Sequence, residues 1–312
     1  MKKLYTLIIL CATVSYLHAQ NIKINLANGE SVTYTTDEIS SIEFNAEPEE
    51  VLFHEFTGWL SVSTAYFQDT YYGDSAVVRV YTKGDGYVCR FHDGVWGDGR
   101  FDITLSRGQI SGTGTLNMDN HRGGTTEYEA TISGPMTAIT ISIPSVMGGT
   151  NILWTYGAAP TAKKIAGTYN GTNFVNVGGV YDYTAESVRQ TITANSDGSI
   201  NLTISSYDIP GTVMGDITIG SYSISNIAYS EDKGGFYKEY ADGVTSVHFK
   251  AVNAQGTTTF DNDYLFNNNS ATSSILIKQT GNVVSFDNTF SIGSMPFPIT
   301  TTMNGVKGGT TR

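Results

Sequence analysis

The sequence is poor in cysteine, proline and charged residues. Its 312 residues include two cysteines and seven prolines, and only 15% are charged, against a usual share of about 25%. Lys and Arg together number 18 and Asp and Glu 29, which gives a formal net charge of -11. This balance argues against nucleic acid as a partner, because phosphate binding needs clustered Lys and Arg.

Long apolar runs and helical periodicity are also lacking. No segment after the N-terminus approaches the roughly 20 apolar residues of a membrane-spanning helix, and no stretch sustains a 3.6-residue period. Glycine (34), tyrosine (19) and phenylalanine (14) are plentiful, and 40% of residues are hydrophobic, too many for a disordered chain. Half-buried strands joined by glycine turns have this composition, so the sequence predicts an all-β fold.

Residues 1–19 have the pattern of a signal peptide. Two lysines precede an apolar run, and Ala19 lies at the predicted cleavage point. Removal of this segment would take away Lys2 and Lys3, change the net charge from -11 to -13 and leave Cys89 as the one cysteine. An exported chain with one cysteine has no internal disulfide. Lipid attachment at Cys11 is the less favoured alternative, because Leu10 precedes that residue.

Residues 20–50 are interpreted as a small hairpin module and an acidic linker. Apolar residues alternate on both sides of Asn28-Gly29, a dipeptide that favours a tight hairpin turn. A capping box at Thr35 and Glu38 and a third strand containing Ile42 and Phe44 are expected to follow. The piece resembles a segment found after the signal peptide in secreted Bacteroidetes proteins, and the matching residues are Gly29, Tyr34, Glu38-Ile39, Ser41-Ile42 and Phe44.

The rest of the chain is interpreted as a diverged repeat, with copies at 51–157 and 158–312. Phe56–Trp59 opens the first copy and Ile165–Tyr169 the second. Each opening leads to a loop with Gly and Tyr. Strands follow in which apolar and polar residues alternate, and tight turns separate these strands. In the middle, we match Gly99–Leu105 to Gly215–Ile219, because both begin with glycine and alternate afterwards. About eight short strands per copy predict two antiparallel barrels, whose closure removes exposed sheet edges. A β-sandwich with crossovers is the alternative.

The repeat resembles the calycin-like β-barrel domains of secreted Bacteroidetes proteins, which are distant relatives of the lipocalins. The opening, middle and closing segments of the two copies carry the resemblance, down to Tyr156-Gly157 and Asn304-Gly305. The opening motif differs from the lipocalin pattern Gly-x-Trp, because Trp59 directly follows Gly58 and Tyr169 replaces the tryptophan in the second copy. The resemblance implies a barrel fold and leaves its role open, with an apolar ligand as one expectation.

Residues suited to catalysis or metal binding form no recognisable motif. Nucleophile, zinc-protease and phosphate-loop sequences are all missing, and no cofactor is expected. His92-Asp93 is the best acid–base pair, but alternation along its strand favours a surface histidine. Two acidic groups could supply oxygen ligands to Ca²⁺, although turns and a polar loop explain both: Asp93, Asp98 and Asp102; and Asp261-Asn262-Asp263 with Asn267–Asn269.

Aromatic side chains near the opening loops are the candidate ligand contacts. We expect them to line the mouths of the two barrels, while Cys89 is expected to be buried as a small apolar residue. Ordinary packing of the core and loops is the competing interpretation. The candidates are Trp59, Tyr66, Tyr71 and Tyr72 in the first copy and Tyr169, Phe174 and Tyr181 in the second.

These patterns together favour an exported, non-enzymatic protein that binds a small apolar molecule, a glycan or a component of the cell envelope. It would act in the periplasm, at the cell surface or outside the cell. The alternative is a structural or interaction module whose barrels are filled by side chains. Burial of Val78, Ile103, Ile141 and Trp154 in a filled interior would exclude the carrier role for the first barrel.

Overall fold

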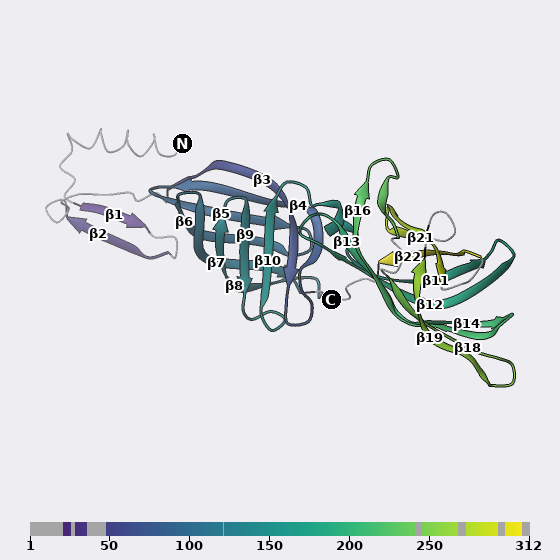
Figure 1. Ribbon diagram of the computed structural model, residues 1–312. Coiled ribbons are helices and arrows are strands. Elements are labelled where there is room, and N and C mark those ends of the chain that lie inside the picture. The colour runs from purple at the N-terminus through teal and green to yellow at the C-terminus, as the bar shows by residue number, and fades with distance from the viewer. Residues whose placement is uncertain are drawn as a thin grey trace. The chain divides into compact units, whose positions relative to one another are not determined.

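The computed structural model in Figure 1 describes most of the chain after residue 47 and two short strands before it. The chain divides into two units, 1–49 and 50–312. The expected signal peptide and Cys11 lie outside the described residues. The structure describes residues 21–25, 29–35, 48–120, 122–240, 245–267, 273–292 and 297–307.

The first unit contains the expected hairpin. Strand β1 (Asn21–Asn25) pairs antiparallel with β2 (Ser31–Thr35), so that Asn25 lies opposite Ser31. Gly29, in the turn, has a φ of 87°, a conformation that glycine adopts without steric cost. The predicted capping box and third strand fall mostly on residues 36–47, which lie outside the described part of the chain.

The second unit begins with a closed, eight-stranded antiparallel barrel (Figure 1). Each strand pairs with the next along the chain, and the last strand returns to the first, with Trp154 opposite Leu60. The predicted barrel is therefore confirmed, and the sandwich alternative is excluded for this copy. Its strands are β3 (Glu50–Ser63), β4 (Thr70–Lys83), β5 (Gly86–Asp93), β6 (Gly97–Ser106), β7 (Gln109–Asp119), β8 (Thr125–Pro135), β9 (Ala138–Ile143) and β10 (Thr150–Tyr156).

Inward side chains pack into one apolar cluster inside this barrel. Along β4, Ala76, Val78 and Val80 are buried while the residues between them are partly exposed, as a period of two requires. Val78, Ile103, Ile141 and Trp154 all belong to this cluster. Cys89 is buried among the same residues, so the predicted burial of its side chain is confirmed.

Gly58 allows Trp154 to pack across the start of the barrel. A Cβ atom at position 58 would lie 2.3 Å from the Thr155 carbonyl oxygen and 2.6 Å from the Trp154 indole. The indole also donates a hydrogen bond of 3.1 Å to the Ala76 carbonyl. The glycine of the opening motif is thus explained by close packing between the first and last strands.

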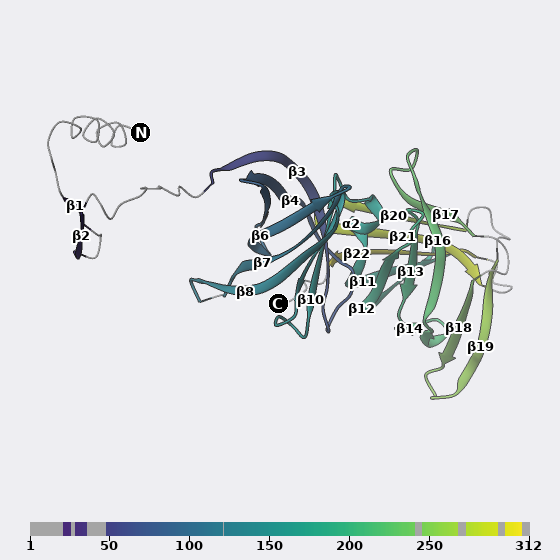
Figure 2. The same ribbon diagram turned by 90° about the vertical axis from the view of Figure 1, so that its left-hand side faces the viewer.

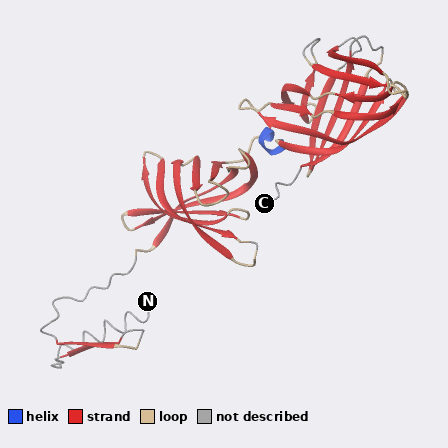
Figure 3. Cartoon of the chain, turned by 90° about the horizontal axis from the view of Figure 1, so that it is seen from below, coloured by secondary structure: helices blue, strands red, loops and turns tan. Residues whose placement is uncertain are grey.

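The second barrel follows a short helix, α2 (Thr161–Ile165), whose Ala162 and Ile165 are buried in the second core. Figure 3 shows how little of the described chain is helical. Strand β22 pairs with both β11 and β21, which closes the barrel. Its strands are β11 (Gly167–Val177), β12 (Tyr181–Ala194), β13 (Ile200–Ile204), β16 (Tyr222–Ser230), β17 (Gly235–Glu239), β20 (Ser274–Thr280), β21 (Val283–Ile292) and β22 (Ile299–Lys307).

Two hairpins inserted into this barrel form a further four-stranded sheet, the side sheet. The first insertion, β14 (Tyr207–Thr212) and β15 (Gly215–Ile219), lies between β13 and β16. The second, β18 (Ser246–Val252) and β19 (Thr258–Asn267), lies between β17 and β20. β15 pairs with β18, and β19 joins the barrel through two residue pairs with β21. Figure 2 shows β14, β18 and β19 grouped together.

The side sheet corrects one part of the sequence interpretation. Gly99–Leu105 lies in the barrel strand β6, whereas Gly215–Ile219 is β15 of the side sheet. β6 is the fourth strand of the first barrel, and the fourth strand of the second barrel is β16, so these two strands correspond. A glycine followed by alternating apolar residues predicts a strand with one buried face, and it does not distinguish a barrel strand from an inserted one. The eight barrel strands predicted for the second copy are confirmed, and the four strands of the side sheet, which was not predicted, extend them to a 12-stranded sheet in the described part of the chain.

Substitution Gly58→Ala should destabilise the first barrel by about 1–3 kcal/mol, the usual cost of overpacking a filled interior. Gly86→Ala is the matched control, because its nearest neighbour would lie 3.6 Å from the new Cβ, and its effect should stay within about 0.5 kcal/mol. Urea unfolding followed by tryptophan fluorescence measures this barrel, since all three tryptophans belong to it. Equal midpoints for the two variants would contradict the packing argument.

Cys89 should be chemically inert in the folded protein. Burial raises the pKa of its thiol to about 12, so that almost no thiolate, the reactive species, is present near neutral pH. In a chain beginning at Gln20, iodoacetamide at pH 8 is expected to leave the native protein unlabelled and to label it once in guanidinium chloride. Rapid labelling of the native protein would show that the first barrel opens more readily than its packing indicates.

Candidate functional site

An apolar cavity of about 200 Å³ lies in the second barrel, between its strands and the side sheet. The barrel contributes residues from β11, β12, β21 and β22, and the side sheet contributes β14, β15 and β18. The lining residues are Val175, Val177, Tyr181, Tyr183, Tyr207, Ile209, Thr212, Val213, Met214, Ile217, Ile219, Phe249, Phe290, Phe297 and Ile299.

Strand alternation explains why the side sheet presents an apolar face to this cavity. In β14, Tyr207 and Ile209 are buried on either side of the exposed Asp208. In β15, Ile217 and Ile219 are buried, and in β18 Phe249 lies between the more exposed His248 and Lys250. The side sheet is therefore amphipathic, and burial of its apolar face against the barrel is the main favourable term that holds it there.

The register of the barrel strands places the lining residues in two successive rows. Val177 pairs with both Tyr181 and Ile299, and Ile299 pairs with Phe290. In the next row, Val175 pairs with Tyr183 and with Thr301. The alternating inward residues at the start of β12 and the end of β11 thus form one wall of the cavity.

The mouth of the cavity is apolar and exposed to solvent. Val213, in the β14–β15 turn, is 71% exposed, and Tyr181 and Phe297 are about half exposed. The Val213 N–H donates a hydrogen bond of 3.2 Å to the Tyr183 hydroxyl, which fixes the turn over β12. Tyr181 and Tyr183 stack with ring centroids 6.5 Å apart. A ligand that enters the cavity therefore passes apolar side chains first.

A buried polar cluster lies further inside the same barrel. Tyr207 is hydrogen-bonded to the side chains of Asn173 and Tyr222. The Asn288 amide donates to the Tyr222 hydroxyl at 3.3 Å, and its oxygen accepts a hydrogen bond from Tyr240. Burial raises the pKa of all three tyrosines, so the cluster consists of neutral hydrogen-bonding groups.

The aromatic candidates of the second copy occupy three different environments. Tyr181 lines the cavity. Tyr169 is buried, packs edge-to-face against Phe286 with centroids 5.5 Å apart, and donates a hydrogen bond of 2.6 Å to the Ile165 carbonyl. Phe174 is exposed between two buried inward residues, Asn173 and Val175, so it points away from the barrel interior. The structure brings one of the three, Tyr181, to the cavity.

The candidates of the first copy do not converge on one site. Trp59 is buried and Tyr66 is 79% exposed. The Tyr71 hydroxyl donates a hydrogen bond of 2.9 Å to Asp74, and burial, with a smaller effect of that carboxylate, raises its pKa to about 12. Tyr72 packs edge-to-face on Trp96 with centroids 5.2 Å apart. These residues have structural contacts of their own.

The polar candidates around His92 form hydrogen bonds in turns and on the surface. His92 Nδ1 lies 2.7 Å from Asp98 rather than beside Asp93. Asp93 is buried and accepts hydrogen bonds from the backbone N–H groups of Val95 and Trp96. Asp102 lies 3.4 Å from Arg100. In the described part of the chain, no three His, Cys, Asp or Glu residues are gathered as a metal site would require.

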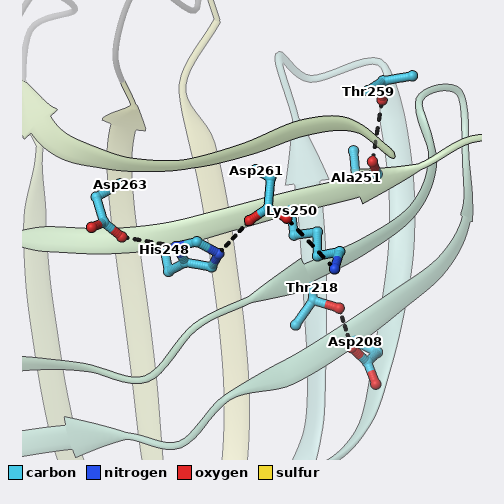
Figure 4. Close-up of polar contacts among 8 residues, drawn as sticks. All are labelled: Asp208, Thr218, His248, Lys250, Ala251, Thr259, Asp261 and Asp263. Carbon is cyan, nitrogen blue, oxygen red and sulfur yellow. Dashed lines mark hydrogen bonds and ion pairs between the residues drawn. The ribbon is translucent and has the colours of Figure 1, made fainter. Parts of the chain in front are cut away.

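The second acidic group lies on the outward face of the side sheet (Figure 4). His248 lies between Asp263, 2.8 Å from its Nδ1, and Asp261, 3.0 Å from its Nε2, and Asp261 also lies 3.6 Å from the Lys250 ammonium. Asp263 and then Asp261 raise the pKa of His248. Beside them, Thr218 donates to Asp208 at 2.6 Å. Of the asparagines in this candidate group, Asn268 and Asn269 lie outside the described residues.

Most of the cavity was not found from the sequence. The sequence interpretation placed Ile217 and Ile219 in a strand equivalent to Gly99–Leu105, and it assigned Ile209 and Phe249 to no strand. One feature of the sequence does point to the side sheet. The second copy is longer than the first, and apolar and polar residues also alternate in its additional residues. Two additional hairpins in one copy indicate an inserted element, which often covers the end of a barrel.

Fold and cavity together define a protein of two closed, eight-stranded antiparallel barrels, one filled and one with an apolar cavity. Residues 165–306 match the family model described as a calycin-like beta-barrel domain. The match covers the second barrel, from the end of α2 to β22, and agrees with the calycin-like resemblance of the sequence. No curated protein matches the chain.

A solved structure shares the fold. A candidate outer membrane protein from Bacteroides fragilis NCTC 9343 is 19% identical with a TM-score of 0.61, and the match covers 81% of this chain and 97% of that one. Transferrin binding protein B from Neisseria meningitidis is 8% identical with a TM-score of 0.24, covering 81% of this chain and 63% of that one. The TM-score of the match to transferrin binding protein B is too low to support any argument. Among the described residues, the structure has no helix of the length and apolarity required to cross a membrane.

The ion pairs of His248 predict a measurable pH dependence. Because its folded pKa is raised, the stabilisation is fully present below the unfolded value of about 6.5 and is lost as the pH rises through the folded pKa. The thermal midpoint of the wild type should therefore fall over this range relative to that of His248→Gln. An NMR titration of the imidazole measures the pKa directly, and a value at or below 6.5 would contradict the ion pairs.

Proposed function

We propose that this protein is an exported, non-enzymatic binding protein whose second barrel holds a small apolar ligand. The cavity between the barrel and the side sheet carries the proposal. The described residues that line it are all uncharged, and aliphatic and aromatic side chains dominate. Such a surface gains free energy when an apolar molecule replaces water.

The size of the cavity limits the ligand. Its volume of about 200 Å³ is below the roughly 300–1,000 Å³ of sites for drug-sized molecules, whereas an apolar cavity of about 150 Å³ holds benzene. One or two fused rings, or the end of an acyl chain, fit this space. A glycan is disfavoured, because its hydroxyl groups would find few polar partners on the lining.

The first barrel supports the alternative role, as a filled structural module. The buried side chains of its interior form one cluster, which includes Val78, Ile103, Ile141 and Trp154. A barrel filled in this way leaves no room for a carried ligand. We therefore assign binding to the second barrel and a rigid, supporting role to the first.

Two observations support export. Residues 1–19 have a basic start, an apolar run and Ala19 at the expected cleavage point. The similar structure from Bacteroides fragilis belongs to a candidate outer membrane protein, which favours the cell envelope for this chain as well. Cleavage after Ala19 is proposed in preference to lipid attachment at Cys11.

A non-enzymatic role is supported by where the titratable side chains lie. His92 forms an ion pair with Asp98 on the surface of the first barrel, and His248 lies on the outward face of the side sheet. Neither histidine lines the cavity. A ligand in the cavity would therefore meet no group suited to proton transfer at neutral pH.

Toluene binding, measured by calorimetry, tests the site. Ile217→Phe places a larger side chain in the cavity and should weaken binding by more than about tenfold, while Tyr181→Ala, which removes part of the mouth, should weaken it by about three- to tenfold. Phe174→Ala is the matched control, because this exposed aromatic residue lies on the outward face of β11. If all four proteins bind toluene equally, or none binds it, the proposal is wrong.

The natural ligand can be sought in the protein purified from its own cell envelope. Native mass spectrometry should show an added mass that is lost in Ile217→Phe and kept in Phe174→Ala. An added mass that Ile217→Phe retains would place the ligand elsewhere in the chain.

A further inference from the structure

We propose that the cavity selects neutral ligands with one hydrogen-bond donor at the inner end, which Asn173 accepts. The inference rests on the proposed function and specifies the class of ligand. It combines the position of Asn173 below the cavity wall, the unpaired state of its side-chain oxygen and the uncharged lining.

Asn173 lies one inward position deeper in β11 than Val175, which lines the cavity. The register shows this directly, since Val175 pairs with Tyr183 and Asn173 pairs with Ala185, the next inward residue of β12. Asn173 is only 2% exposed. Its side chain is hydrogen-bonded to Tyr207, and Tyr207 also lines the cavity. Asn173 and Tyr207 therefore connect the cavity to the polar interior of the barrel.

The Oδ1 atom of Asn173 is a buried acceptor with no hydrogen-bond partner. Buried polar side-chain atoms are nearly always paired, because an unpaired one has lost its bonds to water without replacement. Because Oδ1 has no partner, the hydrogen bond between Asn173 and Tyr207 is donated by the Asn173 amide NH2 group. The oxygen is thus left to accept a hydrogen bond, and a ligand with an N–H or O–H group could supply one.

The surroundings of Asn173 restrict the charge of such a ligand. Among the described residues, no lysine, arginine, aspartate or glutamate lines the cavity, so a charged group inside it would lose its hydration without a counterion. Tyr207 and Tyr222, which are both buried, stay protonated because burial raises their pKa values. A neutral amide, alcohol or ring N–H satisfies these conditions, whereas a carboxylate or an ammonium group does not.

Indole and indene test this selectivity, because they have almost the same shape and differ in one N–H donor. In a wholly apolar cavity indene should bind better, since indole would lose the hydrogen bond that its N–H makes to water. With Asn173 as acceptor, the wild type should bind indole at least as tightly as indene. Asn173→Leu should shift the ratio of the two dissociation constants toward indene by about tenfold.

Thr301→Val is the matched control. Thr301 is buried in the neighbouring strand and pairs with Val175, so it is a polar residue in the row next to that of Asn173. Its indole-to-indene ratio should equal that of the wild type. Asn173→Ala serves as a second variant if Asn173→Leu does not give the wild-type circular dichroism spectrum.

The outcomes separate the two proposals. If neither compound binds, the proposed function fails. If both bind and the wild type prefers indene as strongly as Asn173→Leu does, the cavity is a binding site and the role of Asn173 is wrong. If Thr301→Val shifts the ratio as much as Asn173→Leu, the selectivity does not come from the Asn173 oxygen, and the inference is also overturned.

Discussion

An eight-stranded barrel encloses little more space than its own inward side chains occupy, and the rest of this structure depends on that constraint. In the first barrel, large side chains such as Trp154 and Phe101 fill the interior. In the second, Val175, Val177 and Ala185 occupy inward positions of adjacent strands, and these small residues leave room that the barrel strands do not fill. The cavity thus forms where these small residues face the side sheet, an element that the first barrel lacks.

The side sheet turns that room into an enclosed cavity. Without it, Tyr183, Phe290 and Ile299 would face solvent, at a cost that grows with the apolar area exposed. Ile209, Ile217 and Phe249 cover them, and His248 and Asp208 give the outer face its polarity. The stability of the side sheet and the presence of a binding site are therefore produced by the same apolar contacts.

Sequence reasoning identified the all-β class, both barrels and the strands that open and close each copy, because these depend on local alternation and turn residues. It did not identify the side sheet, since alternation shows that Ile217 and Ile219 share a face but not what that face packs against. Among the aromatic candidates it also could not separate Tyr181, at the cavity, from Tyr169, in the core. That distinction depends on strand register and on the hairpins that cover the barrel, which are long-range properties of the fold.

The pairing of β15 with β18 has an evolutionary consequence. The two hairpins of the side sheet arise from separate insertions in the chain, and each would expose an unpaired strand edge if the other were deleted. Neither insertion is a complete unit by itself, so the two should be gained or lost together during divergence. A relative that has lost one hairpin would have to lose the other, and its barrel interior would need larger side chains to fill the space that remains.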